Sequence, residues 1–293
     1  MTATEKAAQP RGLSLGARYM LGSAVGFSLM SVFVKLAGQR LPSQELVVAR
    51  SVIALVIAWF WLRKKGISPW GTQRRMLVLR GLLGFGGLSC FYYALTAMPL
   101  AEATVIQYMN PIFTAVLALL FLRERIGGTL VTSLILGFGG VMLVAKPAFL
   151  FGGSESTIDP QVASIALLGS LFSAAAYTVI RRLSAKEDAL VIIFYFPLVA
   201  VPLSIPPLLP VALWPTPLEW LLLLAVGITT LFAQVCLTRG LGLLPAGRAT
   251  SISTTQILFA ALLGVSFFGE TPYLLAVLGG GAILLGTWFA AKR

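Results

Sequence analysis

A few polar side chains interrupt the long apolar stretches of this sequence at regular spacing. In residues 101–121, Thr104, Gln107, Tyr108 and Pro111 recur at the i, i+3, i+4, i+7 spacing that places them on one helix face. Such a stripe is unfavourable in apolar surroundings, so we expect it to face the interior or a water-filled pathway. Interhelical hydrogen bonding, worth roughly 1 kcal/mol per group, is the alternative. Residues 246–268 repeat the stripe with Thr250, Ser253, Thr254 and Ile257.

Other candidate binding groups lie inside further apolar stretches. Phe27, Tyr93 and Tyr177 offer rings that stack on an aromatic or apolar group, and Gln234 is an isolated amide. Core packing is the alternative role for each ring. The candidate substrate-binding residues are Phe27, Tyr93, Thr104, Gln107, Tyr108, Tyr177, Gln234, Ser253 and Thr254.

Three basic residues lie within or at the ends of the apolar stretches. Lys35 and Arg182 are expected near opposite membrane faces, where they hold helix ends or act as gating charges. Three roles are open to Arg50: it steers a carboxylate, pairs with an acid such as Glu45, or extends its side chain to the surface. We favour a structural role for these charges.

The residues that are missing exclude most enzyme chemistry. The sequence has no histidine and two cysteines, both in apolar runs. This excludes Ser-His triads, His-Cys dyads and His-ligated zinc. The glycine-rich segments lack the Gly-Lys-Ser/Thr that ends a phosphate loop, so they are expected to pack helices together. We predict no catalytic residue, no metal and no cofactor.

The elements that must position these groups are membrane-spanning helices. The 293 residues are 58% hydrophobic and 11% charged, whereas a soluble protein has about 25% charged residues. A spanning helix needs about 20 apolar residues. We therefore predict an all-α polytopic membrane protein with ten transmembrane helices, at 17–37, 44–62, 76–98, 101–121, 128–146, 161–182, 189–209, 218–240, 246–268 and 272–291. The proline-dense segment 202–217 predicts a kink or a long loop.

The two halves of the sequence resemble each other at an offset of about 146 residues. Cys90 corresponds to Cys236, and Pro99 to Pro245. Five spans in each half give the halves opposite orientations, and such inverted repeats are typical of transporters that bind substrate between the repeats. The predicted organisation is a cytoplasmic tail at 1–16, five-helix repeats at 17–147 and 161–291, and an external linker at 148–160.

The basic residues predict the orientation in the membrane. With the N-terminus in the cytoplasm, 18 of the 22 Lys and Arg residues fall on the cytoplasmic side, Arg80 among them, as the positive-inside rule requires. Both termini are therefore expected in the cytoplasm. The net charge of +12 is spread over short loops that face anionic lipid head groups. Membrane lipid is thus the expected partner, and nucleic acid is not.

Three segments make the sequence similar to the EamA-type exporters of the drug/metabolite transporter superfamily. One is Tyr93-Ala-Leu-Thr-Ala-Met-Pro-Leu-Ala-Glu-Ala-Thr, which continues into Asn110-Pro111 and ends Phe121-Leu-Arg-Glu124. The second-half echo is Leu241-Gly-Leu-Leu-Pro-Ala-Gly-Arg-Ala-Thr250, which ends Phe267-Phe-Gly-Glu270, and the third segment is Val48-Ala-Arg50. Within the superfamily the sequence most resembles the YddG group of amino-acid exporters.

This resemblance implies a bacterial inner-membrane carrier that exports aromatic and other neutral amino acids or similar metabolites by alternating access. No Asp or Glu lies at a helix centre, so we expect a neutral or zwitterionic substrate and little direct proton coupling. A carrier or uptake protein for a nucleoside, vitamin or sugar is an alternative, and so is a solute channel. We expect a small-molecule substrate and a monomer. The predicted cavity lies between the spans at 17–37, 76–98, 101–121, 161–182, 218–240 and 246–268.

Overall fold

The computed structural model describes residues 13–98, 100–151, 159–269 and 274–291, and these residues form helices and loops without strands. Ten helical spans in this part of the chain are long and apolar enough to cross a membrane, which confirms the predicted fold class. The helices are α1 (Leu15–Ala37), α2 (Ser43–Lys64), α3 (Arg74–Ala97), α4 (Leu100–Gln107), α5 (Asn110–Leu122), α6 (Gly128–Ala145), α7 (Ala148–Phe151), α8 (Pro160–Leu183), α9 (Ala189–Leu208), α10 (Pro217–Leu243), α11 (Ala246–Ser253), α12 (Gln256–Phe268) and α13 (Leu274–Ala291).

Several boundaries differ from the predicted ones. α1 already begins at Leu15, and the short helix α7 occupies part of the predicted linker. α9 continues through Pro202, Pro206 and Pro207, because membrane helices tolerate proline when neighbouring groups satisfy the freed backbone. The long loop is confined to residues 209–216. Residues 1–12 of the predicted tail, 152–158 of the linker, Pro99 and Glu270 lie outside the described residues.

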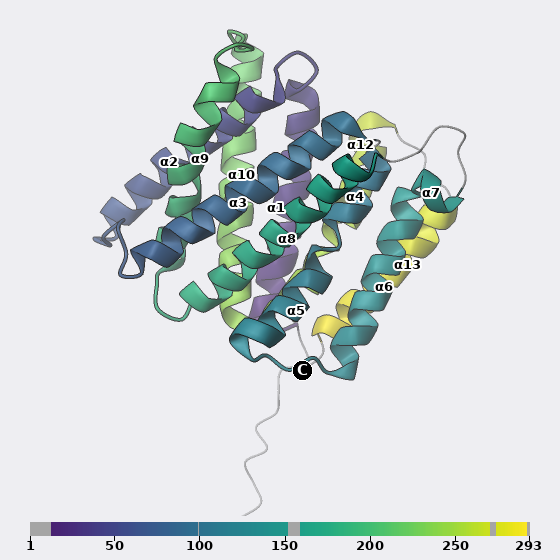
Figure 1. Ribbon diagram of the computed structural model, residues 1–293. Helices are drawn as coiled ribbons and strands as arrows, with labels where there is room; N and C mark the ends of the chain where they lie inside the picture. Colours follow the sequence, from purple (N-terminus) through teal and green to yellow (C-terminus); the bar gives the residue numbers. More distant parts are fainter. Residues whose placement is uncertain (1–12, 99, 152–158, 270–273, 292–293) are drawn as a thin grey trace, which may run out of the picture.

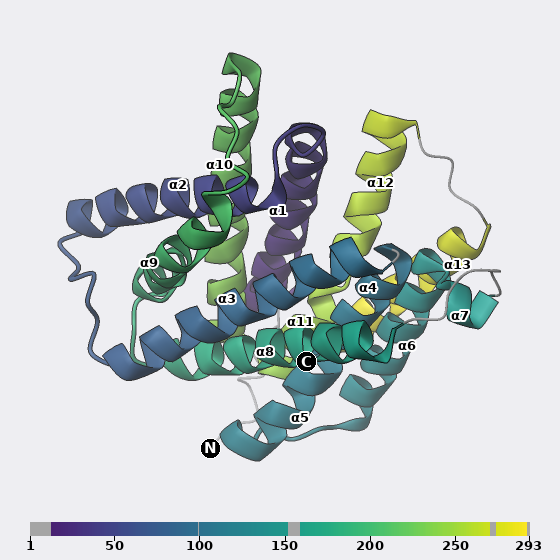
Figure 2. The ribbon, with the colours of Figure 1, turned by 45° about the horizontal axis from the view of Figure 1, so that its top comes forward.

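Two spans are broken in the middle, at corresponding places in the two halves. The first is α4 followed by α5, and the second is α11 followed by α12. The sequence offset of about 146 residues carries the bounds of α4, α5 and α6 onto those of α11, α12 and α13. In Figure 2, α5 runs to the lower edge of the molecule and α12 to its upper edge, as expected for inverted repeats.

The first break follows from Pro111, which stands in the first turn of α5. Proline has no N–H and leaves the carbonyl of Gln107, four residues earlier, without its helical donor. Ser170 Oγ of α8 donates to that carbonyl at 3.3 Å. Pro111 therefore breaks the span at this point, and the freed carbonyl serves a contact between two helices.

The second break has no proline and was not predicted. Instead, the hydroxyls of Ser253, Thr254 and Thr255 donate to the carbonyls of residues 250, 251 and 252, at 2.6, 2.8 and 2.8 Å. Such bonds compete with the helical backbone pattern and loosen it. Three consecutive hydroxyl residues thus do in the second half what one proline does in the first.

The helices pack mainly across the two halves. The main pairs are α1 with α10, α3 with α8, α2 with α9, and α6 with α13. Figure 1 shows α6 and α13 side by side on the right, and α2 with α9 on the left. Gly22 of α1 faces Cys236 of α10, as Gly169 of α8 faces Cys90 of α3. The halves are therefore interleaved repeats and not separate domains.

Glycines allow the closest of these crossings. A Cβ on Gly140 of α6 would lie 2.6 Å from the carbonyl oxygen of Gly279 in α13, and a Cβ on Gly279 would meet Gly140 at the same distance. Backbones approach this closely only where the side chain is absent. The packing role predicted for the glycine-rich segments is confirmed at this crossing.

The molecule has two ends, which we name by what lies there. The end at which α1 begins and α13 ends is the terminal face. The opposite end, which carries the loop between α9 and α10 at the top of Figure 1, is the linker face.

Candidate functional site

A cavity of about 230 Å³ lies in the middle of the molecule, where the two halves meet. Its wall comes from α1, α3, α8, α10 and the two broken spans, with one residue each from α2 and α9. Ligand pockets typically measure about 300–1,000 Å³, so this cavity suits a small metabolite. Its polar and aromatic lining consists of Ser23, Phe27, Arg50, Arg80, Phe91, Gln107, Tyr108, Asn110, Ser173, Tyr177, Phe196, Gln234, Ser253 and Gln256.

The structure brings six of the nine predicted binding residues together at this central cavity. Gln107 Nε2 lies 3.4 Å from Ser173 Oγ, across the wall between α4 and α8. Gln256, beside the second break, is a lining residue that the sequence analysis does not predict. Its backbone carbonyl accepts a hydrogen bond from Ser28 Oγ at 2.9 Å. The six residues are Phe27, Gln107, Tyr108, Tyr177, Gln234 and Ser253.

The other three predicted residues lie elsewhere. Tyr93 lines a second cavity of about 260 Å³ between α2, α3 and α9, which shares Leu88 with the central one. Thr104 is half-buried in α4, away from the cavity lining. Thr254 is buried at the second break, where its hydroxyl bonds to its own backbone. Both broken spans change course at this level, so the helical stripe read from the sequence does not stay on one face.

Arg80 is a cavity residue that sequence reasoning missed. The positive-inside count places Arg80 on the cytoplasmic side. This prediction is wrong, because Arg80 lies inside α3 and is only 3% exposed. Its Nη2 donates to Gln234 Oε1 at 3.1 Å, and its Cζ lies 4.7 Å from the centre of the Phe196 ring. The sequence does indicate a position inside the membrane for Arg80, since this residue falls within the predicted span 76–98.

Arg50 reaches the same ring from α2. Its side chain is buried, at 6% exposure, and its Cζ lies 5.9 Å from the centre of the Phe196 ring. Glu45 is not its partner, because a Glu45 carboxylate oxygen accepts the Leu213 N–H at 3.1 Å instead. Pairing with Glu45 and extension to the surface are therefore both wrong, because the helix turns Arg50 inward.

The central cavity is electropositive. Neither Arg50 nor Arg80 forms an ion pair in the described part of the chain, and the Nε of each is buried without an acceptor. No Asp or Glu is among the described residues that line the cavity. A buried charge without a partner is costly, so this cavity favours a ligand that brings negative charge.

An ion pair at the terminal face links the two halves. Arg181, near the end of α8, donates from Nε to Glu124 Oε1 at 3.0 Å, and Glu124 Oε2 accepts the Ala246 N–H of α11 at 2.7 Å. Glu124 follows α5 of the first half, whereas α8 and α11 belong to the second. Arg182, the predicted gating charge, is exposed beside this pair.

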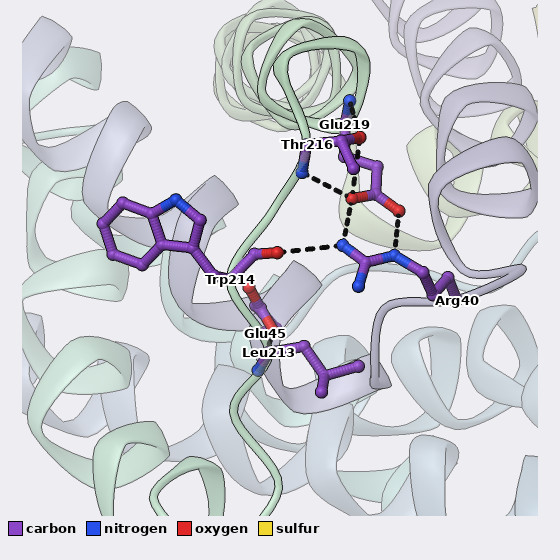
Figure 3. Close-up of polar contacts among 6 residues, drawn as sticks. All are labelled: Arg40, Glu45, Leu213, Trp214, Thr216 and Glu219. Atoms are coloured by element: carbon purple, nitrogen blue, oxygen red, sulfur yellow. Dashed lines mark hydrogen bonds and ion pairs between the residues drawn. The ribbon is translucent and has the colours of Figure 1, made fainter.

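A second ion pair links the halves at the linker face. Figure 3 shows the Arg40 guanidinium between the Glu219 carboxylate, at 2.7 and 2.5 Å, and the Trp214 carbonyl, at 2.9 Å. Glu219 also completes a capping box with Thr216 at the start of α10. Lys35, the other predicted gating charge, is exposed in the last turn of α1.

Comparison with known proteins matches residues 14–146 and 161–291, one stretch per half, to the EamA-like transporter family. The chain is 35% identical to the pseudopaline exporter CntI of Pseudomonas aeruginosa, over 88% of this chain and 89% of that protein. It is 32% identical to human solute carrier family 35 member G1, over 95% and 79% of the two chains. It is 26% identical to an S-adenosylmethionine uptake transporter of Rickettsia prowazekii, over 94% and 91%.

The fold agrees with the crystal structure of a protein whose sequence is 18% identical to this one. The TM-score is 0.83, and the superposition covers 95% of this chain and 97% of the other. The family match spans both predicted repeats, and the inverted helices place a polar cavity between them. This chain therefore belongs to the EamA-like transporter family and is a membrane transporter.

Proposed function

We propose that this protein exports amino acids or related small metabolites by alternating access across a bacterial inner membrane. The observation that carries the proposal is the central cavity, because both inverted halves build its wall. Rocking of one half against the other exposes such a cavity to each side in turn. The proposed transport unit is a monomer with the terminal face in the cytoplasm.

The lining fits an amino acid. The guanidiniums of Arg50 and Arg80 offer bidentate donors to a carboxylate, and the rings of Phe27, Tyr108 and Tyr177 offer apolar faces. A substrate with an extra positive charge finds no carboxylate among the described lining residues. Neutral amino acids such as phenylalanine, methionine and threonine are therefore proposed substrates, and lysine is not.

The relative with the higher identity supports the proposed outward direction. That relative, at 35%, is named an exporter, whereas the uptake transporter is 26% identical. The first name specifies pseudopaline export, and the second specifies S-adenosylmethionine uptake. A solute channel is the less favoured function, because the ion pairs of Glu124 and Glu219 tie the halves together at both ends.

Counterflow in proteoliposomes tests the proposal. Purified protein is reconstituted, the vesicles are preloaded with unlabelled amino acid, and entry of trace labelled phenylalanine, methionine, threonine or lysine is measured. Transient accumulation of the neutral amino acids without lysine is expected for the carrier. Entry that does not respond to preloading would indicate a channel, and no entry of any amino acid would remove the amino-acid assignment.

A further inference from the structure

The two cavity arginines share one aromatic ring but come from different helices. Arg80 of α3 and Arg50 of α2 both place their guanidinium carbons within 6 Å of the Phe196 ring centre, at 4.7 and 5.9 Å. Cation–π contact of this kind holds a guanidinium in place without neutralising it. The ring thus orients two positive charges toward the same part of the cavity.

The remaining contacts of both guanidiniums are neutral. Arg80 donates to the Gln234 amide oxygen at 3.1 Å, and Arg50 Nη1 lies 3.9 Å from Met30 Sδ. Each Nε is buried without an acceptor. The ion pairs of Arg40 with Glu219 and of Arg181 with Glu124 lie at the two faces of the molecule and use other arginines. The centre therefore carries two positive charges whose donors are only partly used.

A zwitterionic ligand does not balance this site. Its carboxylate binds one guanidinium, but its ammonium adds a third positive charge where the described lining offers only hydroxyls, amides and rings. A ligand with a second carboxylate fills the donors of both arginines. Arginine binds carboxylates through paired N–H groups, and such contacts are strong where water is excluded.

We propose that the central cavity selects small carboxylates with a net negative charge, such as acidic amino acids and dicarboxylates, through Arg80 and Arg50. This inference rests on the proposed function, because it takes the central cavity to be the transport site. It refines the substrate class, since an acidic amino acid is preferred to the neutral amino acid of the same shape.

Glutamate, glutamine and lysine provide the test, because they are similar in size and differ in charge. Binding is measured as the shift in thermal unfolding of the purified protein in nanodiscs over a concentration series, and transport is measured by counterflow. The variants are Arg80→Gln and Arg50→Gln, with Arg80→Lys to keep the charge. Arg75→Gln removes an exposed arginine from the same helix α3 as a matched control.

We expect glutamate to bind at least tenfold more tightly than glutamine, and lysine not to bind. Arg80→Gln and Arg50→Gln should each weaken glutamate binding roughly ten- to hundredfold, as expected for loss of a charge-assisted hydrogen bond. Arg80→Lys should retain the preference for glutamate, and Arg75→Gln should bind like the parent.

The two readouts separate this inference from the proposed function. Glutamate binding that needs Arg80, without counterflow, would support the anion site and refute amino-acid transport through it. Counterflow of glutamine as strong as that of glutamate would overturn the anion selection and leave the transporter intact. Stabilisation by glutamate that persists in both glutamine variants would place the anion elsewhere and overturn the inference.

Discussion

Removing the Glu124 carboxylate should open the terminal face. In the structure this carboxylate binds Arg181 at 3.0 Å and the Ala246 N–H at 2.7 Å, and so joins α5 to α8 and α11. In the proposed alternating access, opening the terminal face would separate these elements and break both contacts. Glu124→Ala therefore removes interactions that stabilise only the closed state, and it shifts the equilibrium toward the open state.

The expected size of this shift follows from exposure and charge. The side chains of Arg181 and Glu124 are 30% and 19% exposed, so their ion pair contributes at most about 1 kcal/mol. The charge-assisted bond to the Ala246 N–H contributes about 1.5–3 kcal/mol. A total of about 1.5–4 kcal/mol corresponds to a roughly 10- to 700-fold change in the equilibrium. Glu124→Gln keeps an acceptor oxygen and should shift it only about fivefold.

A cysteine in the cavity wall reports the opening. Ala176→Cys lies on α8, buried at the central cavity, and Cys90→Ala with Cys236→Ala removes the native thiols. An impermeant maleimide is applied from the terminal face, and the labelling rate follows the open fraction while that fraction is small. The neighbouring exposed Arg125 provides the control variant Arg125→Gln. Equal labelling rates in Glu124→Ala and the parent would refute a latch at this position.

Three further predictions concern stability. Burial raises the pKa of the Glu187 carboxyl, but hydrogen bonds from Thr72 and Gln73 outweigh this effect and hold the pKa below its usual 4.5. Glu187→Gln should therefore lower the Tm at pH 7, and the difference in Tm from the parent should vanish as the pH falls below about 4.5. A difference in Tm that stays constant with pH would contradict the assignment. Gly140→Leu should lower the Tm by several degrees, because a Cβ there lies 2.6 Å from a backbone oxygen of α13, whereas Gly139→Leu, with nothing within 4 Å of its Cβ, should not; equal melting curves would refute the packing argument. Arg80→Met should leave the Tm of the ligand-free protein equal or higher, because it removes a buried charge without a carboxylate partner, and a clear fall in Tm in a ligand-free melt would show that Arg80 is structural.

Many residues of the candidate site could be predicted from the sequence. The polar groups Gln107, Tyr108, Tyr177, Gln234 and Ser253 stood out because they interrupt apolar stretches, and each lines the central cavity. The spans predicted to enclose the cavity also correspond to the helices that form most of its wall. The repeat pattern indicates which spans meet between the halves. Helical spacing failed after Tyr108 and at Thr254, because both spans break there.

The position of the arginines needed the tertiary structure. A loop count assigns Arg80 to the cytoplasm because it lies near the start of its span. Whether an arginine near a helix end extends outward or turns inward depends on which neighbour covers it. In this fold, Phe196 of α9 lies over both Arg80 and Arg50, and no local pattern in α2 or α3 predicts that contact.

The sequence by itself determined the ten spans, the repeat and the family, because apolar length, charge in loops and self-similarity are properties of the chain. Tertiary structure decided how the halves interleave, where the second span break lies and which charges meet. These depend on contacts between residues far apart in the chain, such as Gly140 with Gly279 and Glu124 with Ala246. The positive charge of the cavity follows from such contacts, because a buried guanidinium is neutralised only by what the fold places beside it.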